Sequence, residues 1–388
     1  MADDRWFTRR FLLASVANFV FFCAVTSFFS LPVHLEQLGA SRAEIGRVMG
    51  IFGFASLVAI PATGVLVDRF GRRPFLLSGA LGWIVLSLLF VLPEGLGVAF
   101  YVLRIAQGVS FSLAFVAMNA LLVDLAPPGR LGRAIALFGA TTLVAHAVGP
   151  ALGEQIAIHW GFHRLFELVA LDGLVAFALF ALVGRGEVRP ASRERAMSML
   201  GLALRPGARS ALLGGLMTAV AFGTAIHFMP VFVRARGMSS HAPFFLTYVV
   251  AAIAVRFAAG GLSDRVGHRR VGVLSALVFS GSVMGFSGVN GTAALVLWSL
   301  LFGVSHGLAY PSLNALFVEG APDGTRGRAM ALFNLSFNVG ITVAAFAAGE
   351  IAERSGYGAM WAATGAAVLL GVVGLLVDRT GPSQARDV

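Results

Sequence analysis

The sequence has few charged residues for its length and no lysine at all. Of its 388 residues only 12% are charged, 57% are hydrophobic, and the mean hydropathy is +0.84. Soluble domains carry about 25% charged residues, which form the polar shell that a water-exposed surface requires. The composition therefore excludes a soluble domain and indicates long apolar stretches that are solvated by lipid.

Reactive and metal-binding residue types are also scarce. Cys23 is the single cysteine, so neither an intramolecular disulfide nor a CxxC site can form. The eight histidines show no H-x-x-x-H or H-E-x-x-H spacing within a predicted membrane span, so we expect no metal site. No Walker A sequence or nucleophile elbow occurs. We therefore expect no enzyme, no cofactor and no ATP-driven pump.

Apolar stretches long enough to cross a bilayer recur along the whole chain. About 20 apolar residues cross the hydrocarbon core as a helix. We predict an all-α membrane protein with twelve transmembrane helices near residues 11–31, 45–67, 75–92, 97–123, 133–158, 165–184, 210–232, 242–263, 271–288, 292–318, 328–352 and 358–377.

The basic residues are distributed unequally between the loops. All 29 are arginines, the net charge is +10, and 21 of them lie in the termini and alternate loops whereas the opposite loops hold five. By the positive-inside rule both termini are cytoplasmic, in a multi-pass protein of a bacterial inner membrane. The arginines form no aromatic-interleaved basic face, so we expect the lipid bilayer and no nucleic acid as a partner.

The chain contains an internal repeat of about half its length. The four segments 64–73, 119–124, 132–138 and 153–154 recur, with polar residues in register, at 260–270, 314–319, 327–333 and 349–350. Transporters are often built from such repeats. We predict two pseudo-symmetric six-helix bundles, residues 1–184 and 210–388, joined by an Arg-rich cytoplasmic linker, residues 185–209.

Three motifs resemble those of the major facilitator superfamily, and the resemblance covers essentially the whole chain. The loop Gly64-Val-Leu-Val-Asp-Arg-Phe-Gly-Arg-Arg73 resembles the family's G-x-L-x-D-R-x-G-R-R signature, Arg104-Ile-Ala-Gln107-Gly108 its R-x-x-Q-G element, and Gly149-Pro150 its antiporter element. Glu154 stands where the family often has a second glycine. The resemblance is closest to bacterial sugar and multidrug efflux permeases, and it implies a monomer that works by alternating access.

Charged residues at the cytoplasmic boundary are candidates for a gate. They are Asp68, Arg69, Arg73 and Asp124 in the first repeat, and Asp264, Arg265 and Glu319 in the second. A carboxylate and guanidinium groups on a short loop can bind a helix end or a carboxylate of another helix. We predict the pairs Arg69–Asp124 and Arg265–Glu319. The alternative is that these charges only fix the topology.

Two charged residues lie at a similar predicted depth within neighbouring spans. A charge inside a span indicates a functional site by default, and Arg104 and Glu154 are close enough in depth to pair. Glu350 repeats Glu154, so a role at a helix end is an equal alternative. Gly149 and Gly153, with Ala145, form a stripe of small residues suited to close helix packing.

Further polar residues lie deep in the predicted spans. They are Asn18, Gln107, His146, His306, Tyr310, Asn334 and Asn338, which we expect to face a bundle interior and to line a cavity. Arg256 lies two turns before Asp264 and could bind an anionic substrate or close the cytoplasmic gate. Asp172 is the only carboxylate far inside a span, but span six is peripheral in the family's fold.

Three functions are compatible with these residues. The first is a secondary active transporter that exports a small amphiphilic or sugar-like compound in exchange for protons. The second, which Arg256 favours, is an importer or exchanger of a polar or anionic metabolite. The third is a non-transporting membrane sensor or a lipid scramblase, for which a repeated gate signature would have little use.

Overall fold

The computed structural model describes residues 8–93, 95–126, 131–183, 199–205, 207–259, 261–322 and 325–378, and these residues form helices and short connections without a strand. In chain order the elements are α1 (Arg9–Ser27), η1 (Phe28–Ser30), α2 (Leu31–Gln37), α3 (Arg42–Phe70), α4 (Arg72–Leu89), α5 (Val98–Leu125), α6 (Leu131–Val183), α7 (Met199–Ala203), α8 (Ala208–Ala235), α9 (Ala242–Ala259), α10 (Leu262–Val266), α11 (His268–Gly285), η2 (Phe286–Gly288), α12 (Thr292–Glu319) and α13 (Arg326–Val377).

Ten of the helical segments in the described part of the chain are long and apolar enough to cross a membrane. The two longest, α6 with 53 residues and α13 with 52, are each broken at a glycine, Gly161 (φ 83°) and Gly356 (φ 81°). A straight helix of that length would measure about 80 Å, whereas the hydrocarbon core is about 30 Å thick. Each therefore supplies two spans, and the prediction of twelve membrane helices is confirmed.

The first span extends beyond its predicted end at residue 31. It continues through the short 3₁₀ turn η1 into α2, which ends at Gln37. Pro32 lies in the first turn of α2, where a backbone N–H has no helical acceptor, so the proline does not interrupt the helix.

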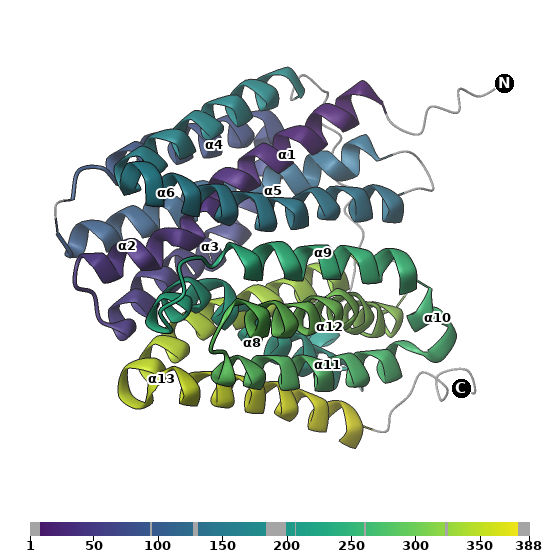
Figure 1. Ribbon diagram of the computed structural model, residues 1–388. Helices are drawn as coiled ribbons and strands as arrows, with labels where there is room; N and C mark the ends of the chain where they lie inside the picture. The colour runs from purple at the N-terminus through teal and green to yellow at the C-terminus, as the bar shows by residue number, and fades with distance from the viewer. Residues whose placement is uncertain are drawn as a thin grey trace, which may run out of the picture. The chain divides into compact units, whose positions relative to one another are not determined.

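The chain packs as two compact units. Unit 1 comprises residues 1–40 and 51–192, and unit 2 comprises residues 41–50 and 193–388. In unit 1, α1 packs on α6, and α4 packs on α5 and α6; in unit 2, α8 packs on α13, and α11 packs on α12 and α13 (Figure 1). Corresponding helices thus make corresponding contacts in the two units, as expected for a repeated bundle.

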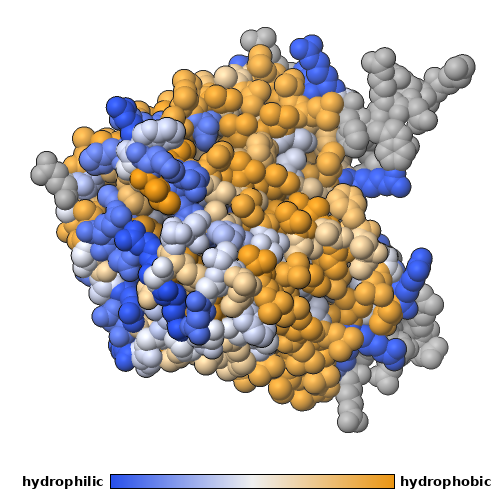
Figure 2. Space-filling view, in the orientation of Figure 1, coloured by the Kyte–Doolittle hydropathy of each residue, from blue (hydrophilic) through white to orange (hydrophobic). Residues whose placement is uncertain are grey.

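The outward-facing side chains of the helices are hydrophobic. Val65, Phe257 and Leu370 are 69%, 85% and 64% exposed, and Figure 2 shows hydrophobic residues over much of one face, with hydrophilic residues gathered toward its edges. Water would oppose such exposure, whereas lipid tails solvate these side chains. The described surface is that of a membrane protein.

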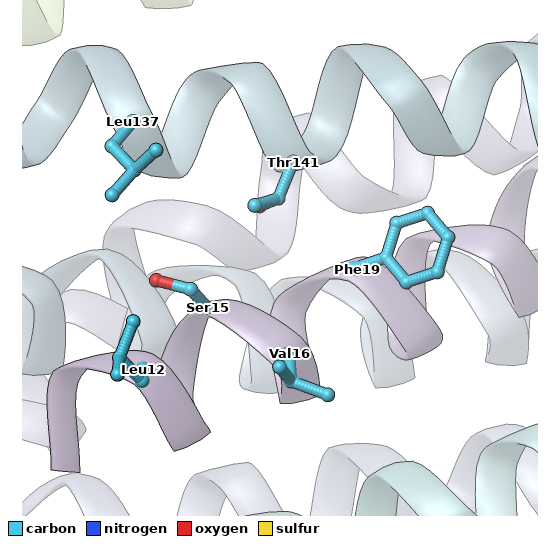
Figure 3. A pocket seen from close by; sticks show the side chains of 6 residues that line it. All are labelled: Leu12, Ser15, Val16, Phe19, Leu137 and Thr141. Atoms are coloured by element: carbon cyan, nitrogen blue, oxygen red, sulfur yellow. The ribbon is translucent and has the colours of Figure 1, made fainter. Parts of the chain in front are cut away.

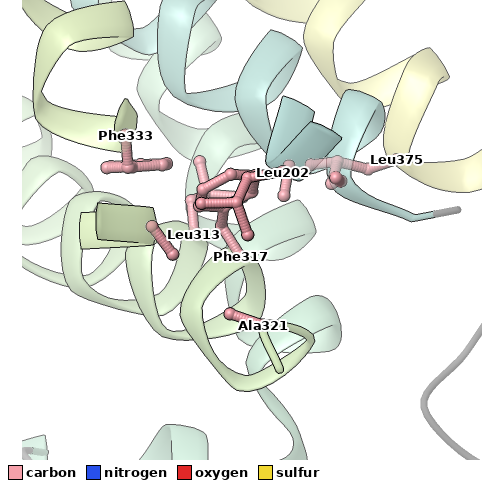
Figure 4. Packing of buried hydrophobic residues seen from close by; sticks show 9 residues of the cluster. Leu202, Leu313, Phe317, Ala321, Phe333 and Leu375 are labelled. Carbon is pink, nitrogen blue, oxygen red and sulfur yellow. The ribbon is translucent and has the colours of Figure 1, made fainter. Parts of the chain in front are cut away.

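The last part of the predicted linker packs onto unit 2. Leu202 of α7 is fully buried among the ends of α8, α12 and α13, against Phe317, Phe333 and Leu375 (Figure 4). Arg205 donates hydrogen bonds to the carbonyls of Leu202 (3.0 Å) and Phe317 (3.2 Å). These contacts attach the segment to unit 2. Residues 185–198 of the predicted linker lie outside the described residues.

Candidate functional site

The first cytoplasmic loop forms an ion pair different from the predicted one. Asp124, near the end of α5, lies 2.8 Å from Nε of Arg72, not beside Arg69. The two side chains are only 12% and 23% exposed. Arg72 is the first residue of α4, so each charge lies at the helix end where the helix dipole disfavours it, and pairing compensates both. The predicted pair Arg69–Asp124 is therefore wrong.

The second loop repeats this contact with a histidine in place of the arginine. Nε2 of His268, the first residue of α11, lies 2.8 Å from Glu319 Oε1 and 3.7 Å from Asp264 Oδ1. The predicted pair Arg265–Glu319 is therefore also wrong. The sequence repeat already aligns His268 with Arg72, and that alignment could have identified both partners.

The remaining predicted gate residues do not join these pairs. Asp68, Arg69, Arg73 and Arg265 are exposed and form no ion pair with any other residue that the structure describes. Arg69 instead lies over the ring of Phe70, 5.2 Å from its centroid. A gate role for these four residues stays a prediction.

The two loop pairs should differ in strength. For Arg72–Asp124 we expect a coupling of about 1–2 kcal/mol, between the values for exposed and buried ion pairs. The coupling of His268 with Glu319 should be smaller, because the Glu319 side chain is 56% exposed whereas that of Asp124 is 23% exposed. Alanine double-mutant cycles, read as shifts in the apparent thermal unfolding midpoint, measure both couplings. A larger coupling for His268–Glu319 than for Arg72–Asp124 would contradict the expectation.

Arg104 of α5 is buried inside unit 1, as predicted for a functional charge. Its side chain is 3% exposed, its guanidinium lies over Phe52 (4.4 Å) and Phe28 (5.9 Å), and Nη1 donates to Oε1 of Gln107 at 3.0 Å. Two predicted residues, Arg104 and Gln107, thus belong to one cluster. Stacking on aromatic faces suits the planar, weakly hydrated guanidinium.

Glu154 is buried in α6, but Glu350 is not its equivalent. Glu154 is 5% exposed, whereas the Glu350 carboxylate is 40% exposed and pairs with Arg47 (3.3 Å) and Arg354 (3.1 Å). The breaks at Gly161 and Gly356 are 195 residues apart, which aligns Glu154 with Gly349. One residue of offset turns a side chain by about 100° around a helix, so the two carboxylates face different surroundings. The pairing of Arg104 with Glu154 stays a prediction.

A second polar group in unit 1 joins α1 to α6. The amide nitrogen of Asn18 donates to Oγ1 of Thr141 (2.7 Å) and Oγ1 of Thr142 (2.9 Å). His146 bonds the Thr142 carbonyl through Nδ1 at 2.8 Å, and its ring lies 5.6 Å from that of Phe29. The structure thus connects Asn18 with His146, two predicted residues that are far apart in sequence.

The predicted polar residues of unit 2 come together on α12 and α13. The Tyr310 hydroxyl donates to Oδ1 of Asn334, and the ring of Tyr310 contacts that of Phe337 at 4.9 Å. His306 stacks on Phe222 of α8, with the rings 4.6 Å apart and inclined by 10°. Asn338 lies one turn after Asn334 and donates to its carbonyl.

Arg256 of α9 lies beside this group. Its Nε donates to the Gly307 carbonyl at 3.3 Å, and its charge interacts with Tyr248 and Tyr310. No carboxylate among the described residues pairs with it.

Equivalent positions in the two units carry different chemistry. Phe111 and Phe115 of α5 align with His306 and Tyr310 of α12, both 195 residues later. The rings of Phe111 and Phe115 stack at 5.2 Å, and Phe22 contacts both. Unit 1 therefore presents an aromatic cluster where unit 2 presents hydrogen-bonding side chains. Sequence analysis missed these phenylalanines, although the repeat alignment locates them. No group of three metal-ligating residues occurs among the residues that the structure describes.

Comparison with known proteins identifies the family. The sequence model of the Major Facilitator Superfamily matches residues 12–322 and 244–387. The chain is 24% identical to the staphylopine export protein of Staphylococcus aureus, over 97% of this chain and 98% of that protein. It is 26% identical to the multidrug resistance protein MdtG of Citrobacter koseri, over 88% of each.

Solved structures share the fold. The nucleoside transporter NupG superposes with a TM-score of 0.81 at 13% identity, covering 96% of this chain and all of that one. A bacterial homologue of the lysosomal transporter Spinster, inward-facing and unoccupied, gives 0.79 at 14% identity, covering 98% and 100%. With the twelve-helix fold and a family match along nearly the whole chain, this protein belongs to the Major Facilitator Superfamily of membrane transporters.

Proposed function

We propose that the chain exports amphiphilic small molecules from the bacterial cytoplasm in exchange for protons. The observation that carries this proposal is the unequal chemistry of equivalent positions: stacked phenylalanines in unit 1, and His306, Tyr310 and Asn334 in unit 2. Aromatic rings bind apolar groups with little specificity, whereas hydroxyl, amide and imidazole groups bind polar ones. The chain therefore offers both kinds of contact that an amphiphilic solute requires.

The relatives support the direction of transport. The two relatives named above are an export protein and a multidrug resistance protein, and this chain matches each of them along most of its length. The arginine-rich loops support an inner-membrane protein with both termini in the cytoplasm.

Proton coupling requires a group that binds a proton within the membrane. Glu154 is the buried carboxylate that lies in α6 with the antiporter element Gly149-Pro150, and we assign it this role. A carboxylate at such a site alternates between a charged and a neutral form, which couples proton binding to a conformational equilibrium.

Proteoliposomes test both parts of the proposal. Vesicles that contain the full chain and are acid inside should accumulate the amphiphilic dye Hoechst 33342, and a proton ionophore should abolish accumulation. Glu154→Gln should lower proton-driven uptake at least tenfold, equivalent to about 1.4 kcal/mol in the barrier. Glu167→Gln is the matched control, because Glu167 lies in the second span of α6, where its side chain is 42% exposed and paired with Arg164. Dye uptake that does not depend on the pH gradient would contradict proton coupling.

Arg256 favours a second candidate, the exchange of anionic solutes. Its guanidinium donates to the Gly307 carbonyl and has no carboxylate partner among the described residues. Flux of carboxyfluorescein that Arg256→Gln abolishes, without any flux of Hoechst 33342, would establish this function instead.

A further inference from the structure

Asp172 is a carboxylate in the middle of a membrane span, and the proposed proton coupling does not use it. The second span of α6 runs from the break at Gly161 to Val183, and Asp172 lies 11 residues after the first and 11 before the second. This length of helix measures about 16 Å, which is about half of the 30 Å hydrocarbon core. Asp172 therefore lies near the mid-plane of the bilayer.

The side chain lies at the border between the buried and the lipid-facing side of this span. Leu168 and Val175, four residues before it and three after, are 37% and 45% exposed. Val169 and Ala176, three residues before it and four after, are 2% and 0% exposed. Residues three and four apart are neighbours on a helix surface. Asp172, which is itself half-buried, is thus within reach of a molecule dissolved in the bilayer.

The carboxylate of Asp172 has no cationic partner. It forms no hydrogen bond or ion pair with any residue that the structure describes, and neither of its oxygens is enclosed by protein. Asp124 and Glu350, by contrast, each pair with an arginine. An ionised carboxylate at this depth is costly unless a cation accompanies it. The position therefore favours either the neutral acid or an ion pair with a cation that comes from the bilayer.

The depth of Asp172 limits what can supply that cation. The amines of lipid headgroups lie at the bilayer surface, about 15 Å away, so they do not reach it. A lipophilic amine dissolves in the hydrocarbon core in its neutral form. There it can take the proton of the carboxylic acid, so that the O–H bond breaks, an N–H bond forms and the resulting ion pair has no net charge. Such a charge-assisted hydrogen bond is strong in surroundings of low dielectric constant.

We infer that Asp172 forms a binding site for lipophilic amines that is open to the bilayer. The amine nitrogen pairs with the carboxylate, and its hydrocarbon arms lie against the exposed side chains of Leu168 and Val175. The site is separate from the polar groups assigned to transport above, and the inference does not depend on the proposed function.

An apolar groove elsewhere in unit 1 provides a contrast. It lies between α1 and the first span of α6, and none of the six side chains that line it is ionisable (Figure 3). Any apolar molecule gains from such a surface in proportion to the area that it covers. Binding that distinguishes a basic ligand from a non-basic one with the same hydrocarbon chain therefore reports on Asp172 and not on contact area.

Carbodiimide modification provides the test, because dicyclohexylcarbodiimide dissolves in the bilayer and reacts with protonated carboxyl groups. The full chain in lipid nanodiscs is treated with this reagent, and modification of Asp172 is followed by peptide mass spectrometry. The basic probe is N,N-dimethyldodecylamine, and the non-basic control is N,N-dimethyldodecanamide, which has the same chain. We expect the amine to slow modification about tenfold, the change for one charge-assisted hydrogen bond, and the amide to leave the rate nearly unchanged.

Thermal unfolding of variants gives a second reading. A ligand that binds the folded state raises the apparent unfolding midpoint. The amine should raise the midpoint of the parent chain more than that of Asp172→Asn, whereas the amide should affect both equally. Glu167→Gln is the matched control, because Glu167 lies in the same span but is paired with Arg164, and this variant should keep the full response to the amine.

Three results would overturn the inference. Absence of modification at Asp172 would show that its carboxyl group is not reached from the bilayer. Equal slowing by the amine and the amide would assign the effect to apolar contact. An equal shift of the midpoint by the amine in the parent chain and in Asp172→Asn would place the bound amine elsewhere.

Discussion

Replacing Gly108 by leucine is expected to prevent unit 1 from packing. A Cβ atom at this position would lie 2.4 Å from the Phe52 carbonyl oxygen, 2.9 Å from the Ala55 Cβ and 3.1 Å from the Ser56 nitrogen. Two of these atoms belong to the backbone of α3, which cannot move aside as a side-chain end can. Overpacking typically costs about 1–3 kcal/mol, and the longer leucine adds to it. We expect little monodisperse protein on size-exclusion chromatography.

Gly303, the repeat counterpart of Gly108, provides an internal replicate. A Cβ there would lie 2.3 Å from the Tyr248 carbonyl oxygen of α9, so Gly303→Leu should be equally damaging. Gly139 and Gly281 have no atom within 4 Å of an added Cβ and serve as controls. Alanine at either should be neutral or slightly stabilising, because glycine weakens a helix. A normal yield of Gly108→Leu would show that α3 and α5 do not approach as closely as described.

The sequence predicted that some glycines allow close contact between helices. Gly149 belongs to the predicted small-residue stripe, and a Cβ on it would lie 2.1 Å from Oγ1 of Thr26 and 2.8 Å from the Cys23 carbonyl oxygen. This confirms close packing of the stripe, against α1. Small residues four positions apart indicate a helix face that packs closely against another helix. They do not identify that other helix, because it lies far away in sequence.

The pairing of charges could not be predicted as well as the spans. Length and hydropathy determine a span almost alone. In contrast, the partner of Asp124 depends on the residue at which α4 begins, because consecutive residues at a helix start point in different directions. Arg72 at the first position reaches Asp124, whereas Arg69 lies before the Gly71 turn. The same sensitivity to a single residue separates buried Glu154 from exposed Glu350.

Replacing Arg104 should abolish transport while leaving much of the fold intact. The guanidinium lies over two aromatic rings and donates to Gln107 within a buried part of unit 1. Lysine keeps the charge but loses the flat stacking surface and the fixed donors, so Arg104→Lys should lower dye flux at least tenfold, about 1.4 kcal/mol in the barrier. Arg104→Ala should lower it further. Proteoliposome flux per folded protein measures the effect, and Arg164→Ala, which removes a 67% exposed arginine, is the control.

The double variant Arg104→Ala with Glu154→Ala shows whether the two charges depend on each other. Both residues are buried, at 3% and 5% exposure. Removing one member of a buried pair leaves the other as an uncompensated charge, which costs more than removing both. If the two interact, the double variant should therefore retain more folded protein and more dye flux than the product of the single effects predicts. Strictly multiplicative losses would mean that Arg104 acts through Gln107 and the aromatic rings alone, and that Glu154 binds its proton independently.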